Sequence, residues 1–169
     1  REEMEHFEEH LATVETNKNK ETTDVMMDVE PTTESIAELT DRNSEWRKQL
    51  RTSMKAKERT AIERVKMPEL DPVYRATTRT EEVNIGLTKE MALTEAKRCL
   101  DCPKPTCMEG CPVSINIPSF IKNIERGQFL AAAKVLKNTS ALPAVCGRVC
   151  PQEKQCESKC IHLKMNEPA

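Results

Sequence analysis

The sequence predicts an all-α protein with long loops, and three observations support this fold class. Apolar residues recur at helical spacing in several stretches of the chain. No stretch alternates apolar and polar residues as a half-buried strand does. No Asn-Gly or Asp-Gly pair marks a tight hairpin turn. We therefore expect helices that are joined by irregular segments.

The composition leaves little material for a large apolar core. Of the 169 residues, 37% are hydrophobic and 32% are charged, and only 3% are aromatic. A domain with so small a core gains from staples such as bound metal. The formal net charge of -2 gives no basic excess of the kind that drives nucleic-acid binding. Nucleic acid is therefore excluded as a partner.

The sequence divides into three segments. Residues 1–35 are expected to be a charged flexible linker or the remnant of a preceding domain, because residues 13–35 are poor in apolar side chains. Within this segment His6 and His10 are spaced for metal binding, but a solvated helix face is the favoured interpretation. Residues 36–90 form a helical and extended lead-in. Residues 91–169 hold every cysteine, and we expect them to be the functional domain.

The lead-in is predicted to contain a helix from Ser35 to Val65. Its apolar stripe is Trp46, Leu50 and Met54, and basic residues surround that stripe. We expect the basic residues to form a solvated face, and docking on an acidic partner is the alternative. They are Arg47, Lys48, Arg51, Lys55, Lys57, Arg59 and Arg64. After this helix, the two prolines of the segment 67–72 are expected to impose extended backbone.

Three further helices are expected around the cysteines. Thr88 is a candidate N-cap for a helix that runs through Leu100 and carries Cys99 at its C-terminal end. Pro118 suits the first turn of a second helix, which Gly127 ends. That helix should direct its apolar residues inward, namely Phe120, Ile121 and Ile124. The third contains Phe129, Ala132, Ala133 and Leu136, and it should pair with the second as an antiparallel hairpin.

The eight cysteines fall into two groups with regular spacing. The first is Cys99-x2-Cys102-x4-Cys107-x3-Cys111-Pro112, and the second is Cys146-x3-Cys150-x5-Cys156-x3-Cys160. A 4Fe-4S cluster takes four ligands, and in two-cluster ferredoxins the cysteine before a proline serves the other cluster. The spacing thus predicts two clusters, with the first three cysteines starting one and Cys111 starting the other.

Zinc and disulfides are the alternatives to iron–sulfur clusters. A zinc ribbon needs a second close pair of cysteines, which the distal spacing lacks, and neither group includes a histidine. The chain shows no apolar signal-peptide core and no run of eighteen apolar residues, so we expect a cytoplasmic protein without a membrane partner. Cytosolic thiols remain reduced, which makes disulfides unexpected. A zinc-stabilised protein-interaction module remains the main alternative.

From about residue 59 onward the sequence resembles a known family. Conspicuous motifs are Met67-Pro68-Glu69-Leu70-Asp71-Pro72, Arg98-Cys99-Leu100-Asp101-Cys102 and Leu142-Pro143-Ala144-Val145-Cys146-Gly147-Arg148-Val149-Cys150-Pro151. They are similar to the N-terminal iron–sulfur domain of the NADPH-dependent glutamate synthase small subunit and of dihydropyrimidine dehydrogenase. The resemblance implies an α-helical ferredoxin-like domain with two 4Fe-4S clusters, preceded here by a partly disordered and helical extension.

The resemblance also implies the cluster ligands. One cluster would be held by Cys99, Cys102, Cys107 and Cys160, and the other by Cys111, Cys150 and Cys156. Cys146 would not be a ligand. The fourth ligand of the second cluster would be a Glu or Gln side chain that follows Ala169 in the family. Such clusters carry single electrons and perform no substrate chemistry, so we assign no catalytic residue in this sequence.

The resemblance further implies an electron-transfer role in glutamate biosynthesis. The domain would relay electrons as part of an NAD(P)H-dependent oxidoreductase of the glutamate synthase type. FAD and NADPH would bind to a domain that is missing from this sequence, whose four glycines form no Gly-x-Gly-x-x-Gly loop. The expected partners are that flavin domain and either the glutamate synthase large subunit or a ferredoxin-reductase-like protein. The fragment alone would not be catalytically complete.

Overall fold

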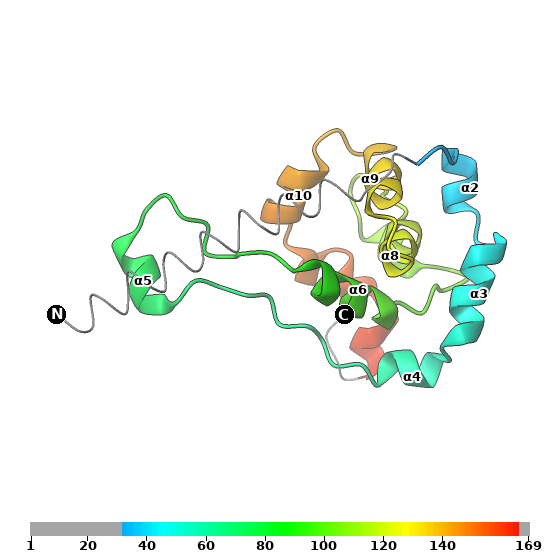
Figure 1. The fold of residues 1–169 in the computed structure, drawn as a ribbon, viewed down its shortest axis with the longest axis horizontal. Coiled ribbons are helices and arrows are strands. Elements are labelled where there is room, and N and C mark those ends of the chain that lie inside the picture. The colour runs from blue at the N-terminus through cyan, green and yellow to red at the C-terminus, as the bar shows by residue number, and fades with distance from the viewer. Residues whose placement is uncertain (1–31, 166–169) are drawn as a thin grey trace. The chain divides into compact units, whose positions relative to one another are not determined.

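The computed structural model describes residues 32–165, and their fold is all-α, as the sequence predicts (Figure 1). Contacts divide the chain into Arg1–Pro31 and Thr32–Ala169. The first unit lies outside the described residues, and so do His6, His10 and nearly all of the expected linker. The described part contains no β-strand. A single bridge within it joins Glu69 and Asn84.

The described helices are joined by short turns and by longer irregular segments, the longest of which precede and follow α5. In chain order they are α2 (Ile36–Thr40), α3 (Glu45–Ser53), α4 (Ala56–Thr60), α5 (Pro72–Thr77), α6 (Lys89–Arg98), α7 (Thr106–Glu109), α8 (Ile117–Glu125), α9 (Phe129–Lys137) and α10 (Pro143–Val149). Three 3-10 turns complete the set, namely η1 (Gln152–Lys154), η2 (Glu157–Lys159) and η3 (Ile161–Met165).

The expected helix from Ser35 to Val65 is divided into α2, α3 and α4. Ser35 caps α2 in a capping box with Glu38, and the chain turns at Asp41 before α3 begins. Met54 adopts extended backbone and separates α3 from α4. Propensity favoured one long helix, but the Asp41 side chain accepts a hydrogen bond from Asn43 N–H, and this local bond favours a break after α2.

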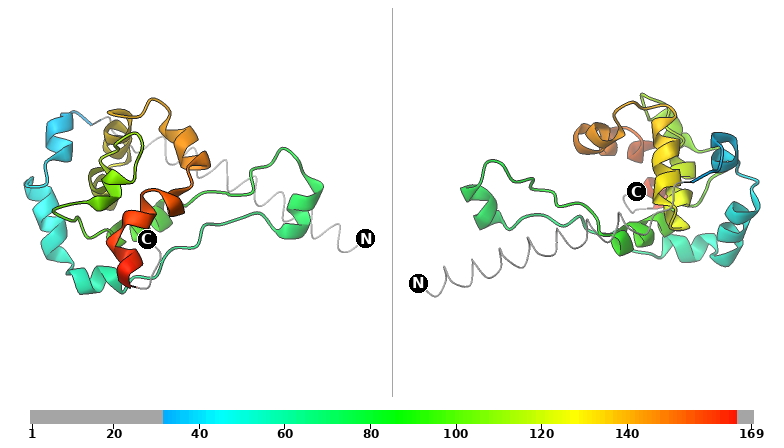
Figure 2. Two further views of the ribbon diagram at one scale, coloured as in Figure 1. Left: turned by 180° about the vertical axis from the view of Figure 1, so that it is seen from behind. Right: turned by 45° about the horizontal axis from the view of Figure 1, so that its top comes forward.

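Residues 61–88 run out to α5 and back again, as the two views of Figure 2 show. Leu70 N–H donates to Val83 O at 2.8 Å, and Ile85 N–H donates to Pro68 O at 2.9 Å. Helix α5 was not expected, because Pro72 was read as a helix-ending residue. The sequence did contain its signal, since Asp71 caps α5 and Pro72 occupies its first turn.

Helices α6, α8 and α9 were predicted well, and α8 packs against both α6 and α9. Thr88 Oγ1 accepts a hydrogen bond from Met91 N–H, and Cys99 is the C-cap of α6. Helix α8 begins with Pro118 in its first turn, and Gly127 (φ +80°) lies in the turn that precedes α9. The antiparallel pairing of α8 and α9 is visible in Figure 1.

The apolar core is small, as the composition indicated. Leu39, Ala131 and Val135 form it, and Phe120 packs against it from α8. The expectation that α8 turns its apolar residues inward was wrong in part, because the fully buried residues of its middle turns are Ser119, Lys122 and Asn123. A polar helix face can be buried only when its groups find partners. The lead-in helices supply several of those partners.

The basic residues of the lead-in do not all form a solvated face. Arg47 and Arg59 are each only 2% exposed, so the expectation was wrong for these two residues. Arg47 donates to Ser119 Oγ at 2.8 Å, and Asn123 Nδ2 donates to Leu39 O at 3.3 Å. The lead-in helices are therefore joined to α8 by buried hydrogen bonds rather than by apolar contact alone.

Candidate metal centre

The resemblance assigns Cys99, Cys102, Cys107 and Cys160 to one cluster, and the structure distributes this first set of cysteines over three elements. Cys99 follows the last turn of α6, Cys102 lies in the following loop, and Cys107 is in α7. Cys160 is the C-cap of η2, far along the chain. Thr106 Oγ1 donates to Lys159 O at 2.6 Å, and this bond holds the neighbouring residues Cys107 and Cys160 side by side. No local pattern in the sequence indicates this contact.

The thiols of these four cysteines interact electrostatically. Burial raises the pKa of Cys107, and together with smaller contributions from the thiols of Cys99, Cys160 and Cys102 it brings this pKa to about 12. Burial also raises the pKa of the Cys102 thiol, and Cys160 adds to the effect. Thiols influence one another in this way only when they are close neighbours. The structure thus brings together the four cysteines that the resemblance assigns to one cluster.

The second set of cysteines consists of Cys111, Cys146, Cys150 and Cys156, and a close backbone contact holds two of its segments together. A Cβ atom on Gly110 would lie 2.5 Å from the carbonyl oxygen of Gln155, so only glycine fits. This contact places Cys111, the next residue after Gly110, near Cys156. Cys150 is the C-cap of α10, and Cys146 lies one turn earlier in the same helix. The four cysteines therefore come from three segments of the chain.

The thiols of this second group also affect one another. Burial raises the pKa of the Cys150 thiol, with further contributions from Cys146 and then Cys111. Burial likewise raises the pKa of Cys156, where the Glu157 carboxylate and Cys111 act in the same direction. Cys146 thus belongs to the group by position, and its sulfur also lies 3.9 Å from Ser140 Oγ.

All eight cysteines are free thiols in the structure. Burial raises the pKa values of five of them, so these metal-free thiols hold their protons at neutral pH and metal binding would release protons. They are Cys99, Cys102, Cys107, Cys150 and Cys156. Within residues 32–165, no three His, Cys, Asp or Glu side chains converge on a point that one metal ion could occupy. Ligands of a 4Fe-4S cluster bind different irons and need not converge in this way. The donor sets suit a cluster.

The loop from Cys99 to Cys102 is held by side chains from other elements. A helix leaves its last carbonyl groups without intrahelical partners. At the end of α6 these partners come from Arg59, Lys122 and Arg42, which donate to Lys97 O at 2.7 Å, Cys99 O at 2.6 Å and Asp101 O at 3.1 Å, respectively. His162 Nε2 pairs with Arg98 O at 3.0 Å. Cationic side chains also suit the negative end of the helix dipole.

Asp101 lies at the centre of this loop and is fully buried, with a φ of 52°. Its carboxylate accepts hydrogen bonds from Arg47 Nη2 at 2.6 Å and from Arg51 Nη1 at 2.5 Å. Burial works against the charged form, but the hydrogen bonds and charge of Arg47 and then Arg51 prevail and lower the pKa of Asp101. The buried pair connects the lead-in directly to the loop between two cysteines.

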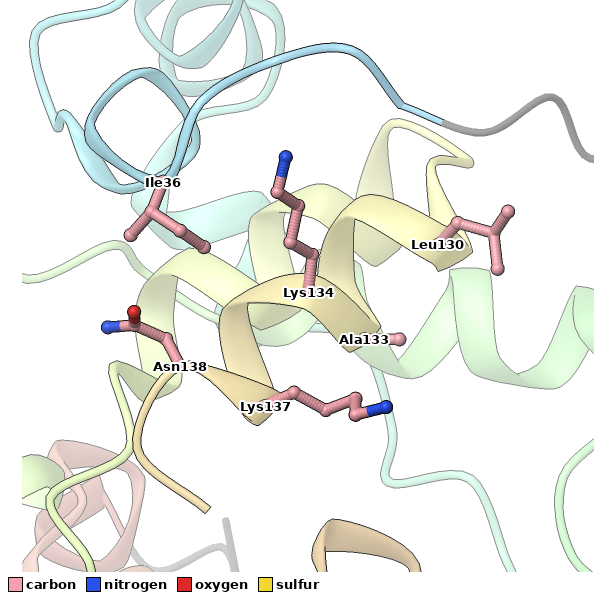
Figure 3. Close-up of a pocket in the computed structure, with 6 residues that line it drawn as sticks. All are labelled: Ile36, Leu130, Ala133, Lys134, Lys137 and Asn138. Carbon is pink, nitrogen blue, oxygen red and sulfur yellow. The ribbon is translucent and has the colours of Figure 1, made fainter. Parts of the chain in front are cut away.

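A surface hollow lies elsewhere, along one side of α9 (Figure 3). It contains no cysteine, and the lysines on its rim point to either side. Its lining residues are Ile36, Leu130, Ala133, Lys134, Lys137 and Asn138.

The described helices include none that is both long enough and apolar enough to cross a membrane.

Two sets of cysteine thiols on a small helical scaffold are the arrangement of an iron–sulfur domain of the ferredoxin type. Residues 75–169 match the family described as dihydropyrimidine dehydrogenase domain II, 4Fe-4S cluster. Because this match covers more than half of the chain, the protein belongs to that family of 4Fe-4S electron-transfer domains. The α-helical fold and the iron–sulfur assignment made from the sequence are confirmed.

Curated relatives extend this result to oxidoreductase subunits. The glutamate synthase [NADPH] small chain of Azospirillum brasilense is 35% identical over 96 residues, which are 57% of this chain and 20% of that protein. The NAD-dependent dihydropyrimidine dehydrogenase subunit PreT of Escherichia coli K12 is 38% identical over 88 residues, 52% of this chain and 21% of the relative. The chain thus spans about a fifth of the length of these relatives.

Proposed function

We propose that this domain relays single electrons through two 4Fe-4S clusters. Cluster one is held by Cys99, Cys102, Cys107 and Cys160. Cluster two is held by Cys111, Cys150 and Cys156, with an oxygen-bearing Glu or Gln side chain as its fourth ligand and Cys146 outside the ligand set. The clusters supply one-electron transfer and no substrate chemistry.

The main support for the proposal is the proximity of four thiols that come from separate elements. After burial, the thiols of Cys99, Cys160 and Cys102 each contribute to the raised pKa of the Cys107 thiol, although these residues belong to separate elements. Thr106 and the buried partners of the Cys99 loop hold those elements together without any metal. Four thiols that a fold gathers in this way are a suitable ligand set for a cluster.

The electron donor and acceptor would lie outside this domain. We propose that the intact protein is an NAD(P)H-dependent oxidoreductase of the glutamate synthase type, located in the cytoplasm, whose FAD and NADPH bind to a separate flavin domain. Its partner would be the glutamate synthase large subunit or a ferredoxin-reductase-like protein. The names of the relatives support both glutamate synthase and dihydropyrimidine dehydrogenase chemistry. A role in glutamate biosynthesis follows from the first.

Anaerobic purification provides the direct test. We expect a brown protein with broad absorption near roughly 400 nm and about eight irons per chain. This absorption should bleach when the protein takes up about two electrons. A colourless protein with two zinc ions would instead identify a zinc-stabilised interaction module. Clusters that cannot be reduced would contradict electron transfer. Assays of the full-length protein for glutamate formation and for dihydropyrimidine oxidation would then distinguish the two enzyme types.

A further inference from the structure

Lys122 is a fully buried lysine whose position the electron-relay role alone does not require. It lies on α8, and its Nζ donates to Cys99 O at 2.6 Å. The same Nζ contacts Glu125 Oε2 at 2.5 Å. Burying an ammonium group costs free energy even when it is paired. A neutral donor would satisfy the Cys99 carbonyl at a lower cost in free energy. The hydrogen bond alone therefore does not explain why a charged side chain is buried at this position.

The charge of Lys122 is not cancelled locally. Glu125 is also paired with Arg59, whose Nη1 lies 2.9 Å from Glu125 Oε1. Both side chains of this second pair are nearly inaccessible to solvent, at 2% and 5%. Two buried cations therefore share one carboxylate, and this triad carries a net positive charge beside Cys99. Water screens such a charge poorly because the triad is buried.

The charge acts on the sulfur atom as well as on the backbone. Burial raises the pKa of the Cys99 thiol, and the Lys122 ammonium opposes this rise by favouring the thiolate. The second thiol group has a different environment. Burial raises the pKa of the Cys156 thiol, and the charge of the Glu157 carboxylate adds to this rise. The charges of Lys122 and Glu157 thus act in opposite directions on Cys99 and Cys156.

We propose that Lys122 raises the reduction potential of cluster one by holding a positive charge beside Cys99. Reduction adds one negative charge to a cluster, and a nearby cation stabilises the reduced form more than the oxidised form. The effect rests on the proposed two-cluster function. Glu125 moderates it, because its carboxylate offsets part of the positive charge. Lys122 is a tuning residue and takes no part in ligation.

The two members of the pair allow a test with opposite signs. Lys122→Met removes the cation, and the ratio of reduced to oxidised cluster one at a fixed potential should fall about tenfold, a shift of about 59 mV for one electron. Glu125→Gln removes the anion and should shift the potential upward. Lys137→Met is the matched control, since Lys137 is exposed on the rim of the α9 hollow (Figure 3). It should change neither cluster.

Potentials are measured by anaerobic redox titration followed by optical and electron paramagnetic resonance spectroscopy. The wave that disappears in Cys102→Ser identifies cluster one. Iron per chain and helix content are measured on every variant, so a variant that fails to fold is recognised. If Lys122→Met does not fold, Glu125→Gln still decides the matter through its upward shift. An unchanged potential in a folded, fully loaded variant, or shifts of the same sign, would overturn the proposal.

The outcomes also separate this inference from the function beneath it. Wild-type protein that takes up no iron would remove the two-cluster function and the tuning role together. Wild-type protein with two reducible clusters, whose potentials do not respond to Lys122 or Glu125, would leave the electron relay intact and remove only the tuning role.

Discussion

The loop around Cys99 and the segment around Cys150 are built in different ways. The Cys99 loop is surrounded by buried charged partners, and Asp101 at its centre is inaccessible to solvent. The segment from residue 142 to residue 163 instead consists of one short helix and three 3-10 turns. It exposes large apolar side chains, with Leu142 at 63%, Val149 at 70% and Leu163 at 50%.

This difference indicates which cysteines the protein positions by its own contacts and which ones depend on bound metal for their position. Buried hydrogen bonds between distant elements order the Cys99 loop without a cluster. Fewer such bonds reach the described residues of the distal segment, chiefly those of Thr106 with Lys159 O and of His162 with Arg98 O. We therefore expect ligation of the proposed clusters to supply much of its remaining order. The two thiol groups should therefore respond differently to mutation and to iron removal.

The largest effect is expected from breaking the buried charge pair. Asp101→Asn leaves Arg47 buried without its anion, and the free energy of unfolding should fall by about 3 kcal/mol. Chemical denaturation of the iron-loaded protein measures this change. The control is Glu82→Gln, which removes the exposed pair between Glu82 and Arg148 and should cost less than about 0.5 kcal/mol. Equal costs would show that the Cys99 loop is not specially held.

Iron removal should distinguish the two regions directly. After anaerobic chelation, amides of α10 and the 3-10 turns should exchange with solvent at least about tenfold faster, because local order there depends on the metal. Amides of α8 and α9 should keep most of their protection. Hydrogen exchange read by mass spectrometry resolves the two segments. Uniform loss of protection would mean that both regions depend on the clusters alike.

Single cysteine variants test the ligand sets. Cys102→Ser and Cys150→Ser should each lose about half of the iron, because each removes a ligand from a different cluster. Cys146→Ala should keep nearly all of it, since this thiol packs near Ser140 and lies outside the proposed ligand set. Iron per chain after anaerobic reconstitution measures all three. A loss of about half in Cys146→Ala would make Cys146 the fourth ligand of cluster two.

The smallest effect concerns the cap of α2, which carries Leu39 into the core beside α8. The Ser35 N–H and hydroxyl lower the pKa of Glu38. A lowered pKa means that the carboxylate stabilises the fold above its unfolded pKa and loses this contribution as pH falls through the folded pKa. The melting-temperature difference between wild type and Glu38→Gln should therefore be present at pH 7 and shrink below about pH 4. A difference independent of pH would contradict this.

Local signals in the sequence were sufficient for the elements that carry them. Thr88, Pro118 and Gly127 marked the ends of α6 and α8 correctly, because caps and backbone restrictions act over a few residues. The cysteine spacing and its proline predicted the iron–sulfur class, which the family match confirms. The ligand sets remain a proposal, although the structure gathers the thiols in the same two groups.

Long-range polar contacts could not be predicted in the same way. Arg47 and Arg59 are spaced as if on a solvated face, and nothing near them indicates that their partners are Asp101 and Glu125. Lys122 was likewise hidden among the apolar residues of α8. Pairing of distant charges depends on how helices pack, and a single sequence records propensity and spacing but not that packing.

Gly110 sets a length that matters for electron flow. Its missing Cβ lets the chain at Cys111 lie directly against the backbone of Gln155, where a methyl group would come within 2.5 Å of the carbonyl oxygen. Any other residue would push these two backbones apart and separate Cys111 from Cys156, two proposed ligands of cluster two. Electron tunnelling between cofactors slows steeply as the gap between them widens, so each proposed cluster has to stay in its place. A single hydrogen atom in place of a side chain would thus help to hold the proposed cluster two where an electron can reach it.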